Sequence, residues 1–373
     1  MPTEGRTFRA PGRVNLIGEH TDYNDGFVMP AAIDFSTWVT AWPLETRRLQ
    51  IVSENFGEGD EAEVDLDDQN LARRGHWSDY PVGVAVMLER AGYRLRGARL
   101  RIRGEVPIGS GLSSSAAVEV ATAIALTALS GLDIDKRELA RICQQAENEF
   151  VGARVGIMDQ FVALFGQAQK ALCLDCRSLE FRLLPVPDNV RLIICNTMVK
   201  HEHSSNAYNE RREQCEAGVK HLAKFLPDVT ALRDVGVDEL EKFGRDLPEV
   251  VYRRCLHVVT ENARVLAAAD ALERSDLGTF GKLMYESHRS LRDDYEVSSK
   301  ELDVMVELAR EVEGVYGARM TGGGFGGCTV NLVATERVEE FQRHVSEGYE
   351  RAMNLKPEIY ISTASNGAEE IMN

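Results

Sequence analysis

The pattern of hydrophobic and polar positions predicts strands in the first third of the chain. Residues 35–42 and 48–54 have strand-like compositions, and residues 97–107 alternate between apolar and polar side chains with period two. A strand pattern returns at residues 327–335. We therefore expect sheet in the N-terminal part of the chain and again near its C-terminal end.

Helical periodicity dominates the middle of the chain. Residues 136–150 carry one apolar stripe with helical spacing, formed by Leu139, Ile142, Cys143, Ala146 and Phe150. Long helices are also expected within residues 199–226 and 250–276. This mixed order predicts an α+β fold rather than a strict βαβα repeat, with a boundary near residues 178–190.

Composition narrows the class of protein. The chain has 373 residues, of which 44% are hydrophobic and 27% charged, which is typical of a globular protein of two or three domains. Its net charge of −16 argues against nucleic-acid and anionic-membrane partners. The N-terminal residues lack an apolar targeting segment, and the apolar stretch at residues 116–129 is too short to span a bilayer, so a cytoplasmic location is expected.

The seven cysteines predict reduced thiols rather than a metal site. Cys173 and Cys176 form a single C-x-x-C pair without a second pair to complete a zinc site. His201, Glu202 and His203 are adjacent, so their side chains point in different directions, and a third ligand is not evident. The start of a solvated helix is the expected structure there.

The first polar cluster is "RAPGRVNLIGEHTDYNDG", residues 9–26. Glu19, His20 and Asp22 lie within four residues, so one turn could present all three side chains to a small polyhydroxylated molecule. Hydroxyl groups both donate and accept hydrogen bonds, which suits carboxylate and imidazole partners. A solvated loop explains the same spacing equally well.

The second cluster is "VPIGSGLSSSAAVEVATAIAL", residues 106–126. Small residues precede a strong helix pattern, and three consecutive serines are good N-cap residues, so the helix N-terminus could bind phosphate. Ser110 stands where a Walker motif needs lysine, and Ser114 replaces the third glycine of the dinucleotide fingerprint. The alternative is a well-capped core helix, but three serines exceed what one cap needs.

The third cluster is "RMTGGGFGGCTV", residues 319–330. Gly322, Gly324 and Gly327 match G-x-G-x-x-G, but a strand pattern follows where a Rossmann fold needs a helix. The stretch is therefore either a tight β-turn or a loop that approaches another group closely.

Two isolated acidic residues are also candidates. Asp159 lies among apolar residues, so its carboxylate needs a partner or a function. Glu147 borders the apolar stripe, and its position alone predicts that it reaches water.

With these clusters in view, the chain resembles the galactokinases of the GHMP small-molecule kinase family. "GRVNLIGEHTDYNDG" is similar to the galactokinase signature, "PIGSGLSSSA" to the phosphate-binding motif and "GARMTGGGFGGCTV" to the third motif. The stretches "QQAENEFVGARVGIMDQF", "CLDCRSLE", "SSNAYNERREQCE" and "SHRSLRDDYEVSS" are also similar, so the resemblance runs from about Ala10 to Val333. Nine residues precede Ala10, where the resemblance begins, and this lead-in is shorter than galactokinases usually have.

The resemblance implies a two-lobed α+β GHMP kinase fold, with the active site in the cleft between an N-terminal lobe (residues 1–180) and a C-terminal lobe (residues 181–373). It implies transfer of the γ-phosphate of ATP, as its Mg²⁺ complex, to the anomeric C1 hydroxyl of D-galactose. The products would be galactose 1-phosphate and ADP, in the first committed step of galactose metabolism. A monomer is expected.

The resemblance also implies roles for individual residues. The catalytic pair would be Arg13 and Asp159. The sugar would be held by Glu19, His20, Thr21, Asp22, Gly156 and Tyr208. The ATP site would comprise Gly109, Ser110, Gly111, Leu112, Ser113, Ser114 and Ser115 around the phosphates, Trp77 at the adenine, and Gly322 and Gly324 as support. Mg²⁺ would be held by Ser115 and Glu147, which reverses the prediction that Glu147 faces water.

Phosphoryl transfer has a loose transition state, so positioning and charge neutralisation supply most of the catalysis. An arginine beside Asp159 would stabilise the carboxylate and weaken it as a base. We therefore expect Asp159 mainly to orient the sugar hydroxyl, with late proton transfer.

Three alternatives remain. The first is a related kinase that acts on N-acetylgalactosamine or arabinose. The second is a non-catalytic galactose sensor, which would have a damaged phosphate loop or lack Asp159, whereas both features are intact in this sequence. The third is a dinucleotide-dependent oxidoreductase, which would bind NAD.

Overall fold

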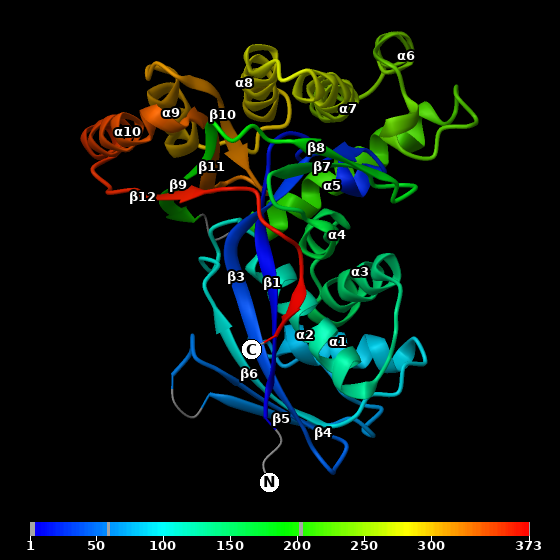
Figure 1. Ribbon diagram of the computed structural model, residues 1–373. Coiled ribbons are helices and arrows are strands. Elements are labelled where there is room, and N and C mark those ends of the chain that lie inside the picture. The colour runs from blue at the N-terminus through cyan, green and yellow to red at the C-terminus, as the bar shows by residue number, and fades with distance from the viewer. Residues whose placement is uncertain (1–3, 58–59, 201–203, 373) are drawn as a thin grey trace.

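A six-stranded mixed sheet forms the lower end of the molecule in Figure 1. The computed structural model describes residues 4–57, 60–200 and 204–372. Strands β4 and β6 run parallel, and the other neighbouring pairs of this sheet are antiparallel. The order is β13-β1-β3-β6-β4-β5, with bounds Glu369–Ile371, Arg6–Asn15, Pro30–Pro43, Ala98–Gly104, Arg48–Ser53 and Glu61–Asp65.

Helices cover one face of this sheet and close the first hydrophobic core. Helices α2 and α4 pack against β1 and β3, and α1 and α3 lie against these two helices. Apolar residues of the strands, such as Val39 and Leu100, meet Val120 and Leu126 of α2 in this core. The helices are α1 (Asp79–Arg90), α2 (Ser114–Ser130), α3 (Lys136–Gln145), a π-helix (Ala146–Val151) and α4 (Met158–Phe165).

A four-stranded antiparallel sheet lies at the other end, in the order β10-β11-β9-β12. Helices α8 and α9 pack on β10, and α10 packs against α9 and β11. The bounds are Val315–Thr321 (β10), Gly326–Ala334 (β11), Val190–Lys200 (β9), Glu358–Ser362 (β12), Leu277–Asp293 (α8), Lys300–Arg310 (α9) and Val338–Met353 (α10).

A small three-stranded sheet and three further helices complete the upper end. The strand order is β2-β7-β8, and the long helix α7 packs against α8, α5 and α6. The bounds are Phe27–Val28 (β2), Lys170–Asp175 (β7), Phe181–Pro185 (β8), Ser204–Leu222 (α5), Val237–Phe243 (α6) and Glu249–Glu273 (α7), with single 3-10 turns at Asp22–Asn24, Leu232–Asp234 and Thr335–Arg337.

The two ends share a core and are joined by more than one crossing of the chain. Val14 and Leu16 of the N-terminal part pack in one cluster with Val330 and Leu332 of β11. The last strand, β13, returns to the six-stranded sheet and pairs with β1. The lobe boundary at residue 180 stays a prediction, but the final strand belongs to the first sheet.

Most elements predicted from periodicity are confirmed. The strands at 35–42, 48–54, 97–107 and 327–335 correspond to β3, β4, β6 and β11, and the five stripe residues at 136–150 are buried. The helix expected from residue 199 begins later, at Ser204, because β9 runs to Lys200, which pairs with Gly326. The stretch from His201 to His203 lies outside the described residues.

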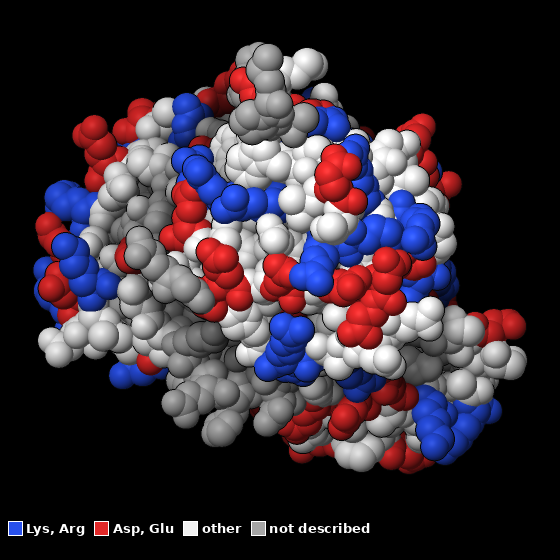
Figure 2. All heavy atoms as spheres, turned by 90° about the horizontal axis from the view of Figure 1, so that it is seen from below, with Lys and Arg blue, Asp and Glu red and all other residues white. Residues whose placement is uncertain are grey.

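All seven cysteines are buried and none forms a disulfide. Within the described residues, none of the helices combines the length and apolar character needed to cross a membrane. Figure 2 shows that cationic and anionic side chains are interspersed on the face seen from below. The surface ion pairs of the structure include Arg48–Glu63 at 2.6 Å and Arg101–Glu54 at 2.6 Å.

Candidate active site

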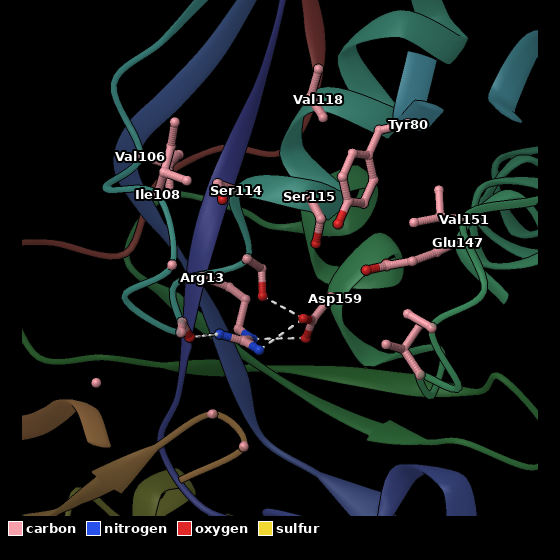
Figure 3. Close-up of a pocket in the computed structure, with 18 of the residues that line it drawn as sticks. Arg13, Tyr80, Val106, Ile108, Ser114, Ser115, Val118, Glu147, Val151 and Asp159 are labelled. Atoms are coloured by element: carbon pink, nitrogen blue, oxygen red, sulfur yellow. Dashed lines mark hydrogen bonds and ion pairs between the residues drawn. The ribbon is translucent and has the colours of Figure 1, made fainter. Parts of the chain in front are cut away.

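A cavity of about 880 Å³ lies where the three motifs meet. Its walls include the N-terminal turn (residues 18–25), the Gly-Ser loop (residues 105–113) and the hairpin loop (residues 322–325). Figure 3 shows Ser115, Glu147 and Asp159 pointing into the same space from three different helical segments. The fold therefore unites polar groups that lie far apart in the sequence.

The Gly-Ser loop connects β6 to α2 through left-handed backbone conformations. Gly109 and Gly111 have φ angles of 74° and 82°, and Ser113 has 62°, which is unusual for a residue with a Cβ. In the described part of the chain no side chain caps the start of α2, so its first backbone N–H groups can serve a ligand. The expected serine cap is wrong, because the Ser113 hydroxyl donates to Asp159 instead.

The residues of this loop do not all face the cavity. Ser114 and Ser115 line it, together with Gly109, Gly111 and Ser113. Ser110 is buried and donates to the carbonyl of Pro107 at 2.7 Å, and Leu112 is buried with its carbonyl accepting from the Arg13 amide at 3.0 Å. Ser110 and Leu112 therefore shape the loop from behind.

The hairpin loop joins β10 to β11 and approaches the Gly-Ser loop closely. A Cβ on Gly322 would lie 2.9 Å from the Gly111 carbonyl oxygen, and one on Gly327 would lie 2.9 Å from that of Ser110. Such contacts are too short for a side chain, so glycine is required here. The third cluster is therefore both a turn between two strands and a loop in close contact with the Gly-Ser loop. Gly322 and Gly324 also line the cavity.

Arg13 and Asp159 form a bidentate ion pair at the centre of the cavity (Figure 3). Arg13 Nε and Nη2 donate to the two carboxylate oxygens at 2.7 and 2.8 Å, and Arg13 Nη1 donates to the Gly111 carbonyl at 2.5 Å. The Asp159 side chain is 25% exposed, whereas Arg13 is almost fully enclosed. The expected arginine partner of Asp159 is therefore confirmed, and the carboxylate faces the cavity.

Glu147 is buried and points into the cavity, so its predicted water-facing position is wrong. Glu147 lies at the edge of the apolar stripe, in the π-helix that follows α3, and this edge of the stripe faces the cavity and not the solvent. Gln160 Nε2 donates to Glu147 Oε2 at 2.8 Å. Burial, and then the charge of Asp159, raise the pKa of Glu147 to about 7.

Glu19 connects the N-terminal turn to the hairpin loop. Its carboxylate accepts from Asn15 Nδ2 at 2.7 Å, from Arg319 Nη1 at 2.5 Å and from the Gly322 amide at 2.7 Å. Arg319 is fully buried and also lies 3.7 Å from Glu261. Three of the acceptor positions of Glu19 are thus occupied by protein donors, which orients the carboxylate at the edge of the cavity.

His20 and Asp22 line the cavity, but Thr21 does not. The Thr21 hydroxyl is buried within the turn, close to the carbonyls of Gly18 at 2.9 Å and Phe27 at 2.7 Å. Burial lowers the pKa of His20 to about 3, so its imidazole is neutral at physiological pH. Burial, and then the charge of Asp159, raise the pKa of Asp22 to about 6.

Gly156 and Tyr208 lie beside the N-terminal turn and line the same cavity. The Tyr208 ring lies 5.3 Å from the His20 ring between centroids. A Cβ on Gly156 would lie 1.9 Å from Asp22 Oδ2, so the two residues are in direct backbone-to-carboxylate contact. This end of the cavity combines polar groups with aromatic surface.

We predict that Gly156→Ala selectively weakens binding at the polar end of the cavity, where the resemblance places the sugar. The new Cβ would displace the Asp22 carboxylate, because 1.9 Å is far inside van der Waals contact. We expect the KM for galactose to rise about tenfold or more with little change in the KM for ATP, as steady-state kinetics would measure. Gly278→Ala is the matched control, since its Cβ would meet nothing closer than 3.7 Å; equal effects of the two changes would contradict the prediction.

The far end of the cavity is apolar and contains Trp77. The Trp77 ring stacks on Phe56, with centroids 5.3 Å apart and planes inclined by 11°, and its Nε1 donates to Asp60 at 3.0 Å. Ile108 and Val118 add further apolar surface to the cavity lining. This surface suits a planar base, as the resemblance implied for Trp77.

Several residues of the site were missed from the sequence. Tyr80 and Phe56 line the cavity, and Gln160 and Arg319 hold Glu147 and Glu19. Of these residues, only Arg319 could have been noticed in the sequence, because it is a charged residue directly before an apolar and glycine-rich stretch. The others have no distinctive spacing, and their roles depend on tertiary contacts.

Comparison with known families defines the class of protein. The model of the GHMP kinases N terminal domain matches residues 79–167, and that of the GHMP kinases C terminal matches residues 268–351. The galactokinase galactose-binding signature matches residues 2–43. The fold is thus the mixed α+β GHMP kinase fold, which a mevalonate kinase from Methanococcus jannaschii shares at a TM-score of 0.67 and 18% identity over 96% of this chain and 98% of that one.

The relatives narrow the class further. A galactokinase from Roseiflexus sp. (strain RS-1) is 46% identical over 98% of this chain and 93% of its own, and one from Chloroflexus aggregans is 47% identical over 97% and 92%. A crystal structure of Lactococcus lactis galactokinase complexed with galactose matches with a TM-score of 0.96 and 38% identity, over 99% of this chain and 96% of that one. The chain belongs to the galactokinase family of GHMP kinases. Its activity is the ATP-dependent phosphorylation of galactose.

Proposed function

We propose that the reaction takes place beside the Arg13–Asp159 pair, where the N-terminal turn and the Gly-Ser loop meet. The observation that carries this proposal is the bidentate pair itself, whose carboxylate faces the cavity between the polar end and the helix N-terminus. The γ-phosphate of ATP would pass to the C1 hydroxyl of galactose at this point. Asp159 would orient that hydroxyl and accept its proton late, and Arg13 would hold the carboxylate and offset phosphate charge.

The nucleotide would lie along the Gly-Ser loop. The uncapped N-terminus of α2 offers backbone N–H groups and the positive end of a helix dipole to the phosphates. Gly109, Gly111 and the serines at 113–115 would line the phosphate path, and Gly322 and Gly324 would support it from the hairpin loop. Trp77 would contact the adenine, while Ser110 and Leu112 would act through the shape of the loop.

Ser115 and Glu147 fit a magnesium site. Their oxygens are hard donors, and both residues line the cavity beside Asp159. Mg²⁺ commonly uses one or two carboxylates and completes its shell with phosphate oxygens and water, so this small donor set suffices. When bound with ATP, Mg²⁺ neutralises phosphate charge. The charge of Mg²⁺ would also offset the repulsion between the Glu147 carboxylate and the phosphates.

Galactose would occupy the polar end of the cavity. Asp22, the remaining acceptor position of Glu19 and the Tyr208 hydroxyl can bond to sugar hydroxyls, and the absence of a side chain on Gly156 leaves room for the Asp22 carboxylate. His20 would form part of the wall. Thr21 would contribute by fixing the turn that carries Asp22, since its own hydroxyl is enclosed.

We predict that galactose affinity falls as the pH drops through about 6. The pKa of Asp22 is raised to about 6, and sugar hydroxyls donate more strongly to a carboxylate than to a carboxylic acid. Binding to the ionised form means that affinity is nearly complete at pH 7 and above, is halved near pH 6 and is about tenfold lower at pH 5. The KM for galactose from pH 5 to 8 measures this, and Asp22→Asn should raise it and flatten its pH dependence. A flat profile in the unaltered protein would contradict the role of Asp22.

The substrate assignment can be tested by ADP release with Mg-ATP and a panel of galactose, N-acetylgalactosamine, arabinose, glucose and mannose. Release with galactose and recovery of galactose 1-phosphate would support transfer to C1. Preference for another sugar would keep the mechanism and change the substrate. We further propose a monomeric, cytoplasmic enzyme, which sedimentation and cell fractionation would test.

A further inference from the structure

A chain of polar groups runs behind the sugar-facing wall of the cavity. Tyr23 OH lies 2.8 Å from His20 Nδ1 and 2.8 Å from Tyr295 OH, and Tyr295 OH lies 3.2 Å from Cys215 Sγ. The other ring nitrogen, His20 Nε2, lies 3.2 Å from the carbonyl oxygen of Gly323. The chain thus crosses from α5, through the segment after α8 and the N-terminal turn, to the hairpin loop.

Chemistry sets the direction of every hydrogen bond in this chain. The Gly323 carbonyl can only accept, so a neutral His20 must carry its proton on Nε2, and Nδ1 must accept from Tyr23. The Tyr23 oxygen then accepts from Tyr295, and the Tyr295 oxygen can accept from the Cys215 thiol. Burial raises the pKa of all three of these donors, which keeps their protons in place.

His20 needs such support because its backbone is strained. Its φ angle is 63°, in the left-handed region that a residue with a Cβ rarely adopts, and such conformations persist only where the surroundings hold them. The ring is packed at 4.8 Å from Tyr295 and 5.3 Å from Tyr208 between centroids. Both ring nitrogens are used inside the protein, so His20 presents a wall rather than a free donor or acceptor.

We propose that Tyr23, Tyr295 and Cys215 are positioning residues for galactose phosphorylation. They lock His20 as the Nε2–H tautomer, and His20 in turn holds the N-terminal turn against Gly323 of the hairpin loop. This inference rests on the proposed placement of galactose beside that turn. Tyr23, Tyr295 and Cys215 do not line the cavity, so they act through His20 and not by touching the sugar.

Tyr23→Phe tests the chain directly, because it removes the hydroxyl and keeps the ring. We expect the KM for galactose to rise about three- to tenfold, as loss of one hydrogen bond does, with kcat and the KM for ATP changed less than twofold. Tyr349→Phe is the matched control: Tyr349 is also buried and donates to the Thr197 carbonyl at 2.9 Å, away from the cavity. Parallel changes in kcat and both KM values, or an unchanged KM for galactose, would overturn the proposal.

Cys215 provides a rescue test. Cys215→Ala should raise the KM for galactose in the same way as Tyr23→Phe, whereas Cys215→Ser, which keeps a donor, should restore it. If the serine and alanine variants behave alike, the thiol has no place in the chain.

Imidazole ¹⁵N resonances of the full-length protein give a readout independent of turnover, with the His20 signals assigned by their absence in His20→Gln. We expect the Nε2–H tautomer and a shift of the Nδ1 resonance in Tyr23→Phe. The opposite tautomer, or an unmoved Nδ1 resonance, would overturn the proposal. If Asp22→Asn leaves galactose binding unchanged while the tautomer is as stated, the sugar placement fails and the hydrogen-bond chain stands.

Discussion

Asp159→Asn is expected to lower kcat by about 10²- to 10⁴-fold, the contribution typical of a positioned proton acceptor. The substitution keeps the shape of the side chain but removes the charge that Arg13 Nε and Nη2 contact at 2.7 and 2.8 Å. An amide would also direct an N–H group at one of those donors. The variant therefore loses both the acceptor for the sugar hydroxyl and the orientation of Arg13.

Single-turnover and steady-state measurements with Mg-ATP and galactose would give this change in kcat. Nucleotide binding should survive, because the N–H groups at the start of α2 are unaltered. Thermal unfolding must be followed in parallel, since Arg13 is almost fully enclosed and loses its partner. Asp67→Asn is a suitable control because Asp67 pairs with Arg47 at 2.9 Å on the surface. Near-normal turnover of Asp159→Asn would contradict both roles proposed for Asp159.

Glu147→Gln is expected to reduce turnover by about 10²-fold or more at saturating ATP. A bound divalent cation contributes several kcal/mol of charge stabilisation to phosphoryl transfer, and the amide is a much weaker ligand than the carboxylate. The fold should tolerate the change, because the amide is isosteric and its oxygen can still accept a hydrogen bond from Gln160. Raising the Mg²⁺ concentration should recover part of the lost rate.

The measurement is the initial rate against free Mg²⁺, together with Mn²⁺ binding in the presence of a non-hydrolysable ATP analogue. Glu149→Gln is the matched control, since Glu149 lies on the same π-helix but is exposed. An unchanged Mg²⁺ dependence in Glu147→Gln would show that the metal is held elsewhere. An equal loss in Glu149→Gln would indicate a general effect on the π-helix.

Local patterns predicted much of the fold because they report which residues must be buried. The stripe from Leu139 to Phe150 located α3, and the strand pattern of residues 97–107 located β6. Both depend on spacing within a few residues, which neighbouring side chains determine. The same reasoning failed at Glu147, because spacing locates the edge of the stripe but does not tell whether that edge faces solvent or a cavity built by other segments.

The sequence by itself determined the three motifs, the galactokinase resemblance and the residues that could carry the chemistry. Only the tertiary structure decided which of these residues meet. Arg13 and Asp159 are 146 positions apart, and Arg319 and Glu19 are 300 apart, so their pairing depends on how β1, β10 and α4 pack. The tertiary structure also places Thr21, Ser110 and Leu112 outside the lining of the cavity. The physical reason is that a motif specifies residue types, whereas left-handed turns and long-range packing set the direction in which each side chain points.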